Sequence, residues 1–234
     1  MKKKLSLLLV IAVLSALMTA CGTQSTPANT AAPAANTTAP EAGSRRILVV
    51  CFSYFDNTDG ENITSQQYAD ALSSASVTVV DGKRRGNNDV VADTIRAQTG
   101  ADLFSIRTEE PYPSDYDGGF VQQMLQDNKD HRQPVLASQT PDLSQYDTVV
   151  LLYPIWWYDL PMAVYAFLDA YDLSGKTVAP VATSGGSGLV DTVSAIRKAE
   201  PGATVTAGLA IRAEDAASCG PAVASWLTQT GIAP

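Results

Sequence analysis

The sequence predicts an α/β domain, with a doubly wound, five-stranded parallel sheet and helices on both of its faces. Five apolar runs of strand length alternate with segments of helical pattern, which is typical of parallel strands joined by right-handed crossovers. The runs 47–52 and 148–153 are almost continuously apolar, as expected of strands that are covered on both faces. We expect the strands, numbered along the chain, to lie in the order 2-1-3-4-5.

The five predicted strands follow from this apolar pattern. They cover residues 47–52, 102–106, 148–153, 177–182 and 203–207. Pro180 lies inside the fourth strand, and proline has no N–H to donate to a neighbouring strand. We therefore expect a bulge or a locally unpaired amide at Pro180.

Helices are predicted between the strands and at the C-terminal end. They cover residues 89–98, 116–130, 162–170, 189–199 and 216–230. Gly100 is a stop signal for the first of them and Pro161 a start signal for the third. The stretch 54–85 is too long for a simple turn between the first strand and the first helix. We interpret it as an insertion, in which residues 77–82 form an extra strand and turn.

The first 44 residues are predicted to lie outside the folded domain, which then covers 45–234. Three lysines precede an apolar run of signal-peptide length, and the motif Met18-Thr19-Ala20-Cys21 resembles the lipobox of bacterial lipoproteins. This resemblance implies a signal peptide over 1–20 and a lipid on Cys21, so that the protein is exported and anchored to the cell membrane. The alternative is an ordinary secretory signal with a chance cysteine. Residues 21–44 are rich in alanine, threonine and proline, which is typical of a tether.

The charge and the rare residues narrow the function classes. The formal net charge is −8, which argues against nucleic acid as a partner because phosphate binding needs a basic face. An acidic domain suits docking on basic protein surfaces, although the charge could equally serve solubility. Cys51 and Cys219 could pair in an exported protein, or Cys51 could be a small core residue. The single histidine, His131, gives little support to a metal or triad site.

Three loops are the candidate ligand site, because ligands of open parallel sheets lie beyond the carboxyl ends of the strands. The first strand leads to Ser53 and, past the insertion, to Gly86-Asn87-Asn88, where helix amides could hold an anion. A plain helix cap explains these residues equally well. The loop Pro154-Ile155-Trp156-Trp157-Tyr158 could hold a planar ring, or its tryptophans could pack beneath the loop or form a docking patch. In the sequence Thr183-Ser184-Gly185-Gly186-Ser187-Gly188, small residues either expose backbone N–H groups or form a flexible loop.

Taken together, these motifs resemble those of the flavodoxins. The resemblance covers nearly all of residues 46–211 and implies bound FMN, with its phosphate at Ser53, Gly86, Asn87 and Asn88. The isoalloxazine ring would lie between Pro154, Ile155, Trp156 and Trp157 on one side and residues 183–188 on the other. Asn88 stands where the family usually has threonine. The segment Ser-x-x-x-Asn-Thr, which ends in Asn57 and Thr58, offers a rival phosphate loop.

The function that this resemblance implies is redox chemistry by bound FMN. The leading hypothesis is an electron carrier between membrane-associated redox partner proteins, because the sequence shows no second nucleotide-binding motif. An NAD(P)H-dependent quinone reductase is the alternative enzyme. A third possibility is a non-redox domain that has lost FMN and binds a ligand or peptide through its aromatic loop. No metal is expected, and no residue is an evident acid, base or nucleophile.

Overall fold

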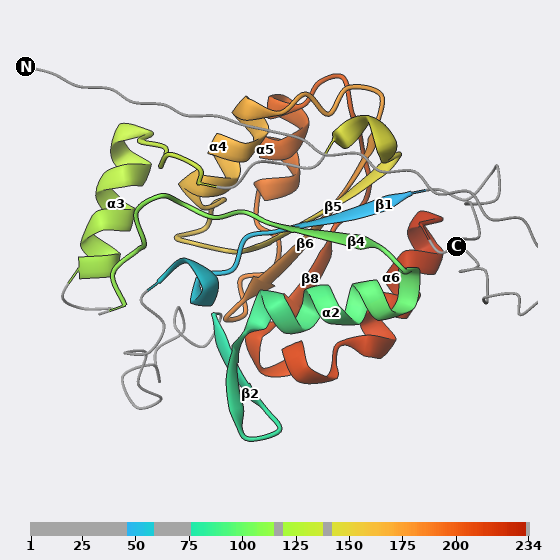
Figure 1. Cartoon of the computed structure of the whole chain (residues 1–234), viewed down its shortest axis with the longest axis horizontal. Coiled ribbons are helices and arrows are strands. Elements are labelled where there is room, and N and C mark those ends of the chain that lie inside the picture. The colour runs from blue at the N-terminus through green and yellow to red at the C-terminus, as the bar shows by residue number, and fades with distance from the viewer. Residues whose placement is uncertain (1–45, 59–75, 115–118, 138–141, 233–234) are drawn as a thin grey trace, which may run out of the picture. The chain divides into compact units, whose positions relative to one another are not determined.

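The computed structural model describes residues 46–58, 76–114, 119–137 and 142–232. The predicted signal peptide (1–20), the tether (21–44) with Cys21, and part of the predicted insertion (59–75) lie outside these ranges. Within the described residues, a central sheet carries helices on both faces (Figure 1). None of the described helices is long and apolar enough to span a membrane.

The central sheet is parallel throughout. Its strands are β1 (Ile47–Cys51), β4 (Asp102–Ser105), β5 (Thr148–Pro154), β6 (Thr177–Ser184), β7 (Thr204–Val205) and β8 (Leu209–Arg212). They lie in the order β4-β1-β5-β6-β7, and β8 also pairs with β6. The predicted order 2-1-3-4-5 is confirmed, because the apolar strand β1 lies between β4 and β5 in the fully buried centre.

The predicted fifth strand is divided into two. β7 pairs with Thr177 and Val178 of β6, whereas β8 pairs with residues 181–184 of the same strand. Between these pairings, β6 has no strand partner at Pro180 on its outer side, although Pro180 pairs with Leu151 of β5 on the inner side. The missing N–H of proline therefore coincides with a break in the neighbouring strand, and the expected unpaired position is confirmed.

The helices match the predicted segments, with shifted ends. They are α2 (Asn87–Thr99), α3 (Val121–Asp130), α4 (Met162–Ala170), α5 (Thr192–Ala199) and α6 (Gly220–Thr230), and the short 3-10 helices are η1 (Phe55–Asn57), η3 (Leu143–Gln145) and η4 (Ala213–Ser218). α5 begins three residues later than predicted, after Gly188 and Val190, which both have positive φ and so cannot belong to a right-handed helix. α6 begins after η4, which takes up the first predicted turn.

Two apolar layers enclose the sheet. On one face Leu48 and Val50 belong to a buried cluster with Phe167 of α4 and Ile196 of α5. On the other face Val49 belongs to a second cluster, contributed largely by α2 and α6. Strand residues alternate between the two layers because successive side chains point to opposite faces. Cys51 and Cys219 both lie in the second layer as free, buried thiols, so the disulfide considered for this pair is not formed.

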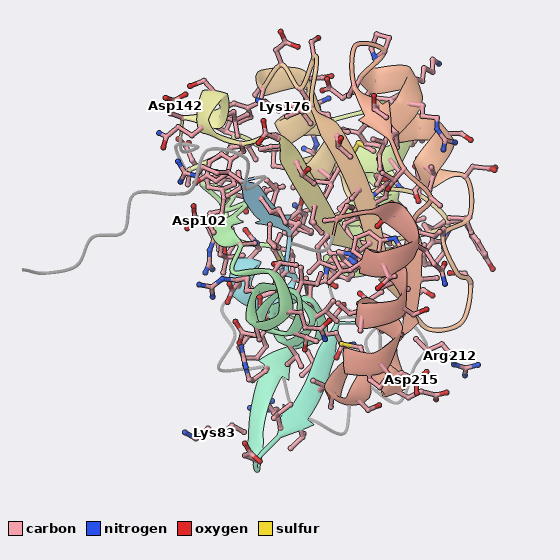
Figure 2. All side chains as sticks on the ribbon, turned by 90° about the vertical axis from the view of Figure 1, so that its right-hand side faces the viewer. Lys83, Asp102, Asp142, Lys176, Arg212 and Asp215 are labelled. Atoms are coloured by element: carbon pink, nitrogen blue, oxygen red, sulfur yellow. The ribbon has the colours of Figure 1, made fainter. Side chains whose placement is uncertain are left out.

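The described end of the insertion is a β-hairpin. β2 (Val77–Val80) and β3 (Lys83–Gly86) pair antiparallel, so the strand and turn predicted at 77–82 are confirmed. Asp81 and Gly82 form the turn with φ of 51° and 73°, as a tight hairpin turn requires. Figure 2 shows Lys83 and Arg212 toward the same end of the domain, away from Asp102 and Lys176, which lie near strand starts. The hairpin returns the chain to this end, where α2 begins.

Candidate functional site

The three predicted loops meet at one edge of the sheet. β1, β5 and β6 are neighbours, and all three run in the same direction. Pro154 pairs with Thr183 at the ends of β5 and β6, and the Ile155 N–H donates a 2.8 Å hydrogen bond to the Thr183 carbonyl. The Phe52 N–H donates to the Leu152 carbonyl beside them. The loops after β1, β5 and β6 therefore line one edge, where the fold places ligands.

The first part of the site is a tight contact between Ser53 and the start of α2. The Ser53 hydroxyl donates a 2.9 Å hydrogen bond to Oδ2 of Asp89. A Cβ on Gly86 would lie only 2.3 Å from each of these two oxygens, so a larger residue at this position would force the Ser53 and Asp89 side chains to move. Gly86 is also the N-cap of α2, and no side chain caps this helix end. The N–H groups of its first turn thus carry the positive end of the helix dipole without a capping side chain.

Asn87 and Asn88 are buried in this contact region rather than exposed. The Asn87 N–H donates to the Ser76 carbonyl. The side-chain amide of Asn88 donates to the Phe52 carbonyl at 2.7 Å, and its oxygen accepts from the Thr183 hydroxyl at 2.7 Å. The Asn88 side chain is therefore committed to joining β1, α2 and β6, and what it can offer a ligand is its backbone N–H.

Asn57 of the rival loop also has a structural role. Its side-chain amide donates to the carbonyls of Ser53 and Ile106, at 2.8 and 2.9 Å. Its side-chain oxygen accepts from the backbone N–H of Thr108 at 2.9 Å. These bonds hold the segments after β1 and β4 together and bury Asn57.

The second part of the site is a turn that presents two aromatic side chains. Trp156 and Asp159 exchange two backbone hydrogen bonds of 3.0 Å, and the central residues Trp157 and Tyr158 have φ of 51° and 65°. Left-handed conformation costs a bulky residue about 1–2 kcal/mol. Trp157 and Tyr158 are nevertheless 45% and 74% exposed, so burial of their own side chains does not offset this cost.

The Asp159 side chain holds the turn in place through hydrogen bonds. Its Oδ1 accepts hydrogen bonds from the Leu160 N–H at 2.7 Å and from the Tyr165 hydroxyl at 2.9 Å. Burial, followed by the hydrogen bond to Asp159, raises the pKa of Tyr165, which keeps its hydroxyl protonated as a donor. The surroundings therefore hold the turn in its strained shape, which is typical of functional positions.

Trp156 lies beneath the turn, where it does not expose its ring. It is 2% exposed, and four rings pack edge-on around it with centroid separations of 4.9–5.8 Å: those of Phe52, Tyr54, Tyr112 and Phe120. This position corrects the expectation that both tryptophans face a ligand. Burial of a large aromatic surface decides the place of Trp156, and Trp157 is the one that presents a ring.

The third part of the site is the glycine-rich loop after β6. Ser184 is buried, and its hydroxyl oxygen accepts from the N–H groups of Gly186 and Gly188 at 3.3 and 3.1 Å. Gly186 and Gly188 have φ of 134° and 71°, conformations that glycine adopts at little cost. Gly185, Gly186 and Ser187 are exposed. Hydrogen bonds to Ser184 hold this loop in a path that leaves small residues at the same sheet edge as the aromatic turn.

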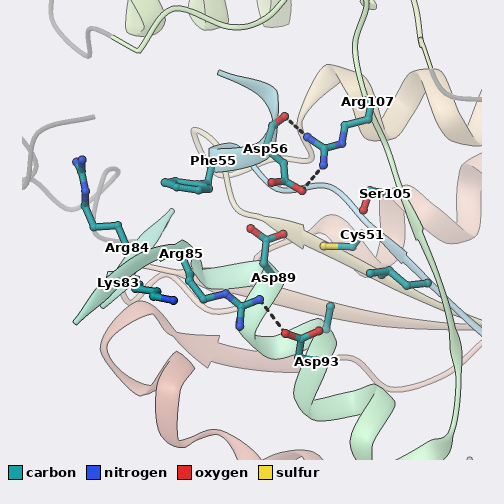
Figure 3. A pocket seen from close by; sticks show the side chains of 12 residues that line it. Cys51, Phe55, Asp56, Lys83, Arg84, Arg85, Asp89, Asp93, Ser105 and Arg107 are labelled. Carbon is teal, nitrogen blue, oxygen red and sulfur yellow. Dashed lines mark hydrogen bonds and ion pairs between the residues drawn. The ribbon is translucent and has the colours of Figure 1, made fainter. Parts of the chain in front are cut away.

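A cavity of about 560 Å³ lies beside the start of α2 and is lined by charged residues that the sequence did not predict to be part of the site. Figure 3 shows Asp56 and Asp89 pointing into it, with Arg107 paired to Asp56 at 2.6 Å and Arg85 paired to Asp93 at 2.7 Å. Among the described residues, Asp89 forms no ion pair. Burial, and next the charge of Asp56, raise the pKa of Asp89 to about 6.

Tyr158 belongs to the aromatic loop that the sequence already marks as a place for a planar ring. One residue of the edge, Asp89, was missed from the sequence. Asp89 directly follows Gly86-Asn87-Asn88, but only the fold turns its carboxylate toward Ser53. In the described ranges, no group of three or more His, Cys, Asp or Glu residues is arranged to hold a metal ion.

Comparison with known proteins identifies similar chains. A family model described as Flavodoxin matches residues 77–229. A proposed flavoprotein from Bacteroides eggerthii is 25% identical, with a TM-score of 0.56, over 80% of this chain and 98% of that one. A proposed flavoprotein from Bacteroides uniformis is 21% identical, with a TM-score of 0.56, over 79% and 99%.

A third similar structure contains a ligand. It is a flavoprotein from Lactobacillus acidophilus NCFM in complex with FMN, and it is 17% identical with a TM-score of 0.51, over 78% of this chain and 98% of that one. At such low identity this likeness, like that to the Bacteroides uniformis protein, shows a shared fold. No curated protein sequence matches the chain.

Proposed function

This chain belongs to the flavodoxin family, and on that premise we propose that it binds FMN at the carboxyl edge of its sheet and carries electrons with it. The observation that carries the proposal is the division of this edge into two unlike halves. A glycine cradle lies at the start of α2, and an exposed aromatic turn lies beside a glycine-rich loop. FMN has the same division, into a phosphate and a planar ring.

The start of α2 fits the phosphate. Gly86 lets Ser53 Oγ and Asp89 Oδ2 lie where a Cβ would clash with both, and the uncapped helix end supplies N–H donors and a favourable dipole. Ser53 adds a hydroxyl from the end of β1. Asn57, the rival, already bonds three backbone groups, which supports Gly86, Asn87 and Asn88 as the phosphate loop.

The aromatic turn and the glycine-rich loop fit the isoalloxazine ring. Trp157 would stack on one side of the ring, and Tyr158 follows it on the same turn. Gly185, Gly186 and Ser187 lie at the adjacent loop, where small residues let the ring approach the backbone. In this proposal the strained backbone at Trp157 and Tyr158 serves binding. It points both aromatic side chains outward, which a relaxed turn would not do.

The residues of the chain bind and orient the cofactor, while FMN supplies one- or two-electron transfer when it is bound. The net charge of −8 disfavours additional negative charge on a reduced ring and so lowers its reduction potential. Acidic surroundings also favour redox partners with basic docking surfaces. The lipobox-like motif at Cys21 supports a carrier that is exported and held by a lipid anchor near membrane-bound partners.

The test of the carrier role is a comparison of electron sources. We expect the purified protein with FMN to exchange electrons with dithionite and with a one-electron dye, but to oxidise NADH and NADPH only slowly when a quinone is present. Rapid steady-state oxidation of NADH or NADPH with a quinone would instead identify an NAD(P)H-dependent quinone reductase and reject the carrier role.

A further inference from the structure

The proposed phosphate cradle contains a carboxylate of the protein itself. Asp89 lies in the first turn of α2, and its Oδ2 accepts the hydrogen bond of the Ser53 hydroxyl at 2.9 Å. The same Oδ2 would lie 2.3 Å from a Cβ on Gly86. Asp89 therefore holds the one side-chain hydroxyl of the cradle, beside the backbone of Gly86 and the first turn of α2.

Among the described residues, no cation forms an ion pair with Asp89. The cavity that it lines brings together charged and titratable groups from every adjacent element: Cys51, Asp56, Lys83, Arg84, Arg85, Asp93 and Arg107. Two of the arginines are already paired, Arg85 with Asp93 and Arg107 with Asp56. Burial and the charge of Asp56 raise the pKa of Asp89, and these effects outweigh the Ser53 hydrogen bond and the two arginines, which lower it. The buried Cys51 thiol beside it has a raised pKa and stays neutral.

A phosphate in this cradle would face a like charge at short range. Two negative charges about 4 Å apart repel strongly where the effective dielectric constant is lower than that of water. Protonation of Asp89 removes this repulsion and turns the carboxyl group into a donor toward a phosphate oxygen. Binding of the phosphate therefore raises the affinity of Asp89 for its proton, and protonation of Asp89 raises the affinity for the phosphate to the same extent.

From this juxtaposition we infer that Asp89 is a specificity-determining residue, which makes the site take up one proton together with the phosphate of FMN. The inference rests on the proposed function. It means that FMN binds more tightly in a mildly acidic medium than at neutral pH. Riboflavin, which has the same ring and no phosphate, binds without this dependence on pH.

The expected change in FMN affinity with pH follows from the fraction of protein in which Asp89 is protonated. With its pKa at about 6, this fraction falls from about nine-tenths at pH 5 to about one-thirtieth at pH 7.5. The apparent dissociation constant rises in proportion to the loss of the competent form. We therefore expect FMN affinity to fall about thirtyfold between these two pH values.

The experiment is a fluorescence titration of FMN and of riboflavin with the purified protein at pH 5 and pH 7.5. Riboflavin controls for pH effects on the ring and on the fold, and Asp89→Asn separates the proton on Asp89 from that of the FMN phosphate, whose second pKa of about 6 lies in the same range. Asp89→Asn keeps the shape and a hydrogen-bond acceptor for Ser53 but carries no charge. We expect it to bind FMN about thirtyfold more tightly than wild type at pH 7.5, with the acid preference removed.

The matched control is Asp93→Asn, which removes the same charge one turn later in α2. Asp93 lines the same cavity but pairs with Arg85 and Arg96, and this variant still carries Asp89, so we expect it to retain a preference for FMN in acid that Asp89→Asn loses. Equal FMN affinity of wild type at both pH values, or an unchanged dependence in Asp89→Asn, would overturn the inference and leave FMN binding intact. Failure of FMN to bind at both pH values would overturn the proposed function itself.

Discussion

The Thr183 hydroxyl donates a 2.7 Å hydrogen bond to the side-chain oxygen of Asn88, and this bond joins the end of β6 to the first turn of α2. The Asn88 amide also donates to the Phe52 carbonyl at the end of β1. All three groups are buried. The asparagine that stands in place of a family threonine therefore fixes the relative positions of the three segments that form the candidate site.

Breaking this link is expected to destabilise the domain. Asn88→Ala leaves the Phe52 carbonyl and the Thr183 hydroxyl without this partner, which costs about 1–3 kcal/mol in the free energy of unfolding. Thr183→Val removes the other end, and the two changes are expected to be coupled by about 0.5–3 kcal/mol in a double-mutant cycle measured by urea unfolding. Thr228→Val, which removes an exposed hydroxyl bond within α6, is the control. If the losses in unfolding free energy of Asn88→Ala and Thr183→Val simply add in the double variant, the hydrogen bond between the two residues does not contribute to stability.

Gly86 and Gly220 make a matched pair for testing the cradle. Gly86→Ala brings a Cβ within 2.3 Å of Ser53 Oγ and Asp89 Oδ2, and we expect a loss of about 1–3 kcal/mol in stability together with weaker FMN binding. Gly220→Ala meets an atom of Gln98 at an ordinary 3.8 Å, and because it precedes Pro221 we expect at most a modest loss of stability, with FMN binding unchanged. Thermal unfolding and FMN titration of both variants distinguish a local clash from a general effect of the methyl group.

The two tryptophans are expected to respond in opposite ways. Trp157→Ala removes an exposed ring and should weaken FMN binding by about 1–3 kcal/mol while leaving the unfolding free energy nearly unchanged. Trp156→Ala empties the centre of an aromatic cluster and should cost about 3–5 kcal/mol in stability. A Trp157→Ala variant that binds FMN like wild type would show that this ring faces something other than the cofactor.

The sequence predicted the strand order, the hairpin and the unpaired position at Pro180 because these depend on periodicity and on proline chemistry, which are local. Local sequence patterns could not predict which of Trp156 and Trp157 is buried and which is exposed. They are adjacent and chemically identical, and only the turn at Trp157 and Tyr158 decides which ring is buried. The orientation of Asp89 toward Ser53 joins residues 36 positions apart, across the insertion, and so depends on the tertiary fold.

Asp89 also predicts how stability changes with pH. Its pKa is raised from 3.8 to about 6 in the folded state, so the folded protein binds more protons than the unfolded chain between these values. Stability therefore falls as the pH rises from about 4 to about 6 and is then level with respect to this group. The difference corresponds to at most about 3 kcal/mol, and partial exposure of the side chain reduces it to about 1–2 kcal/mol.

The check is urea unfolding of wild type and Asp89→Asn across pH 4–8. The difference in unfolding free energy between the two proteins isolates this group from the other carboxylates. We expect the variant to gain stability relative to wild type as the pH rises through this window. A difference that does not vary with pH would show that Asp89 ionises freely in the folded protein.

The most direct test of the account is whether this domain binds FMN at all. FMN fluorescence is titrated with the purified protein at pH 5, and the visible spectrum of the mixture is recorded after unbound flavin is removed. We expect saturable quenching at one FMN per chain and a retained yellow colour, both reduced in Trp157→Ala. Unchanged fluorescence at up to about 100 μM protein, with a colourless protein after separation, would contradict it.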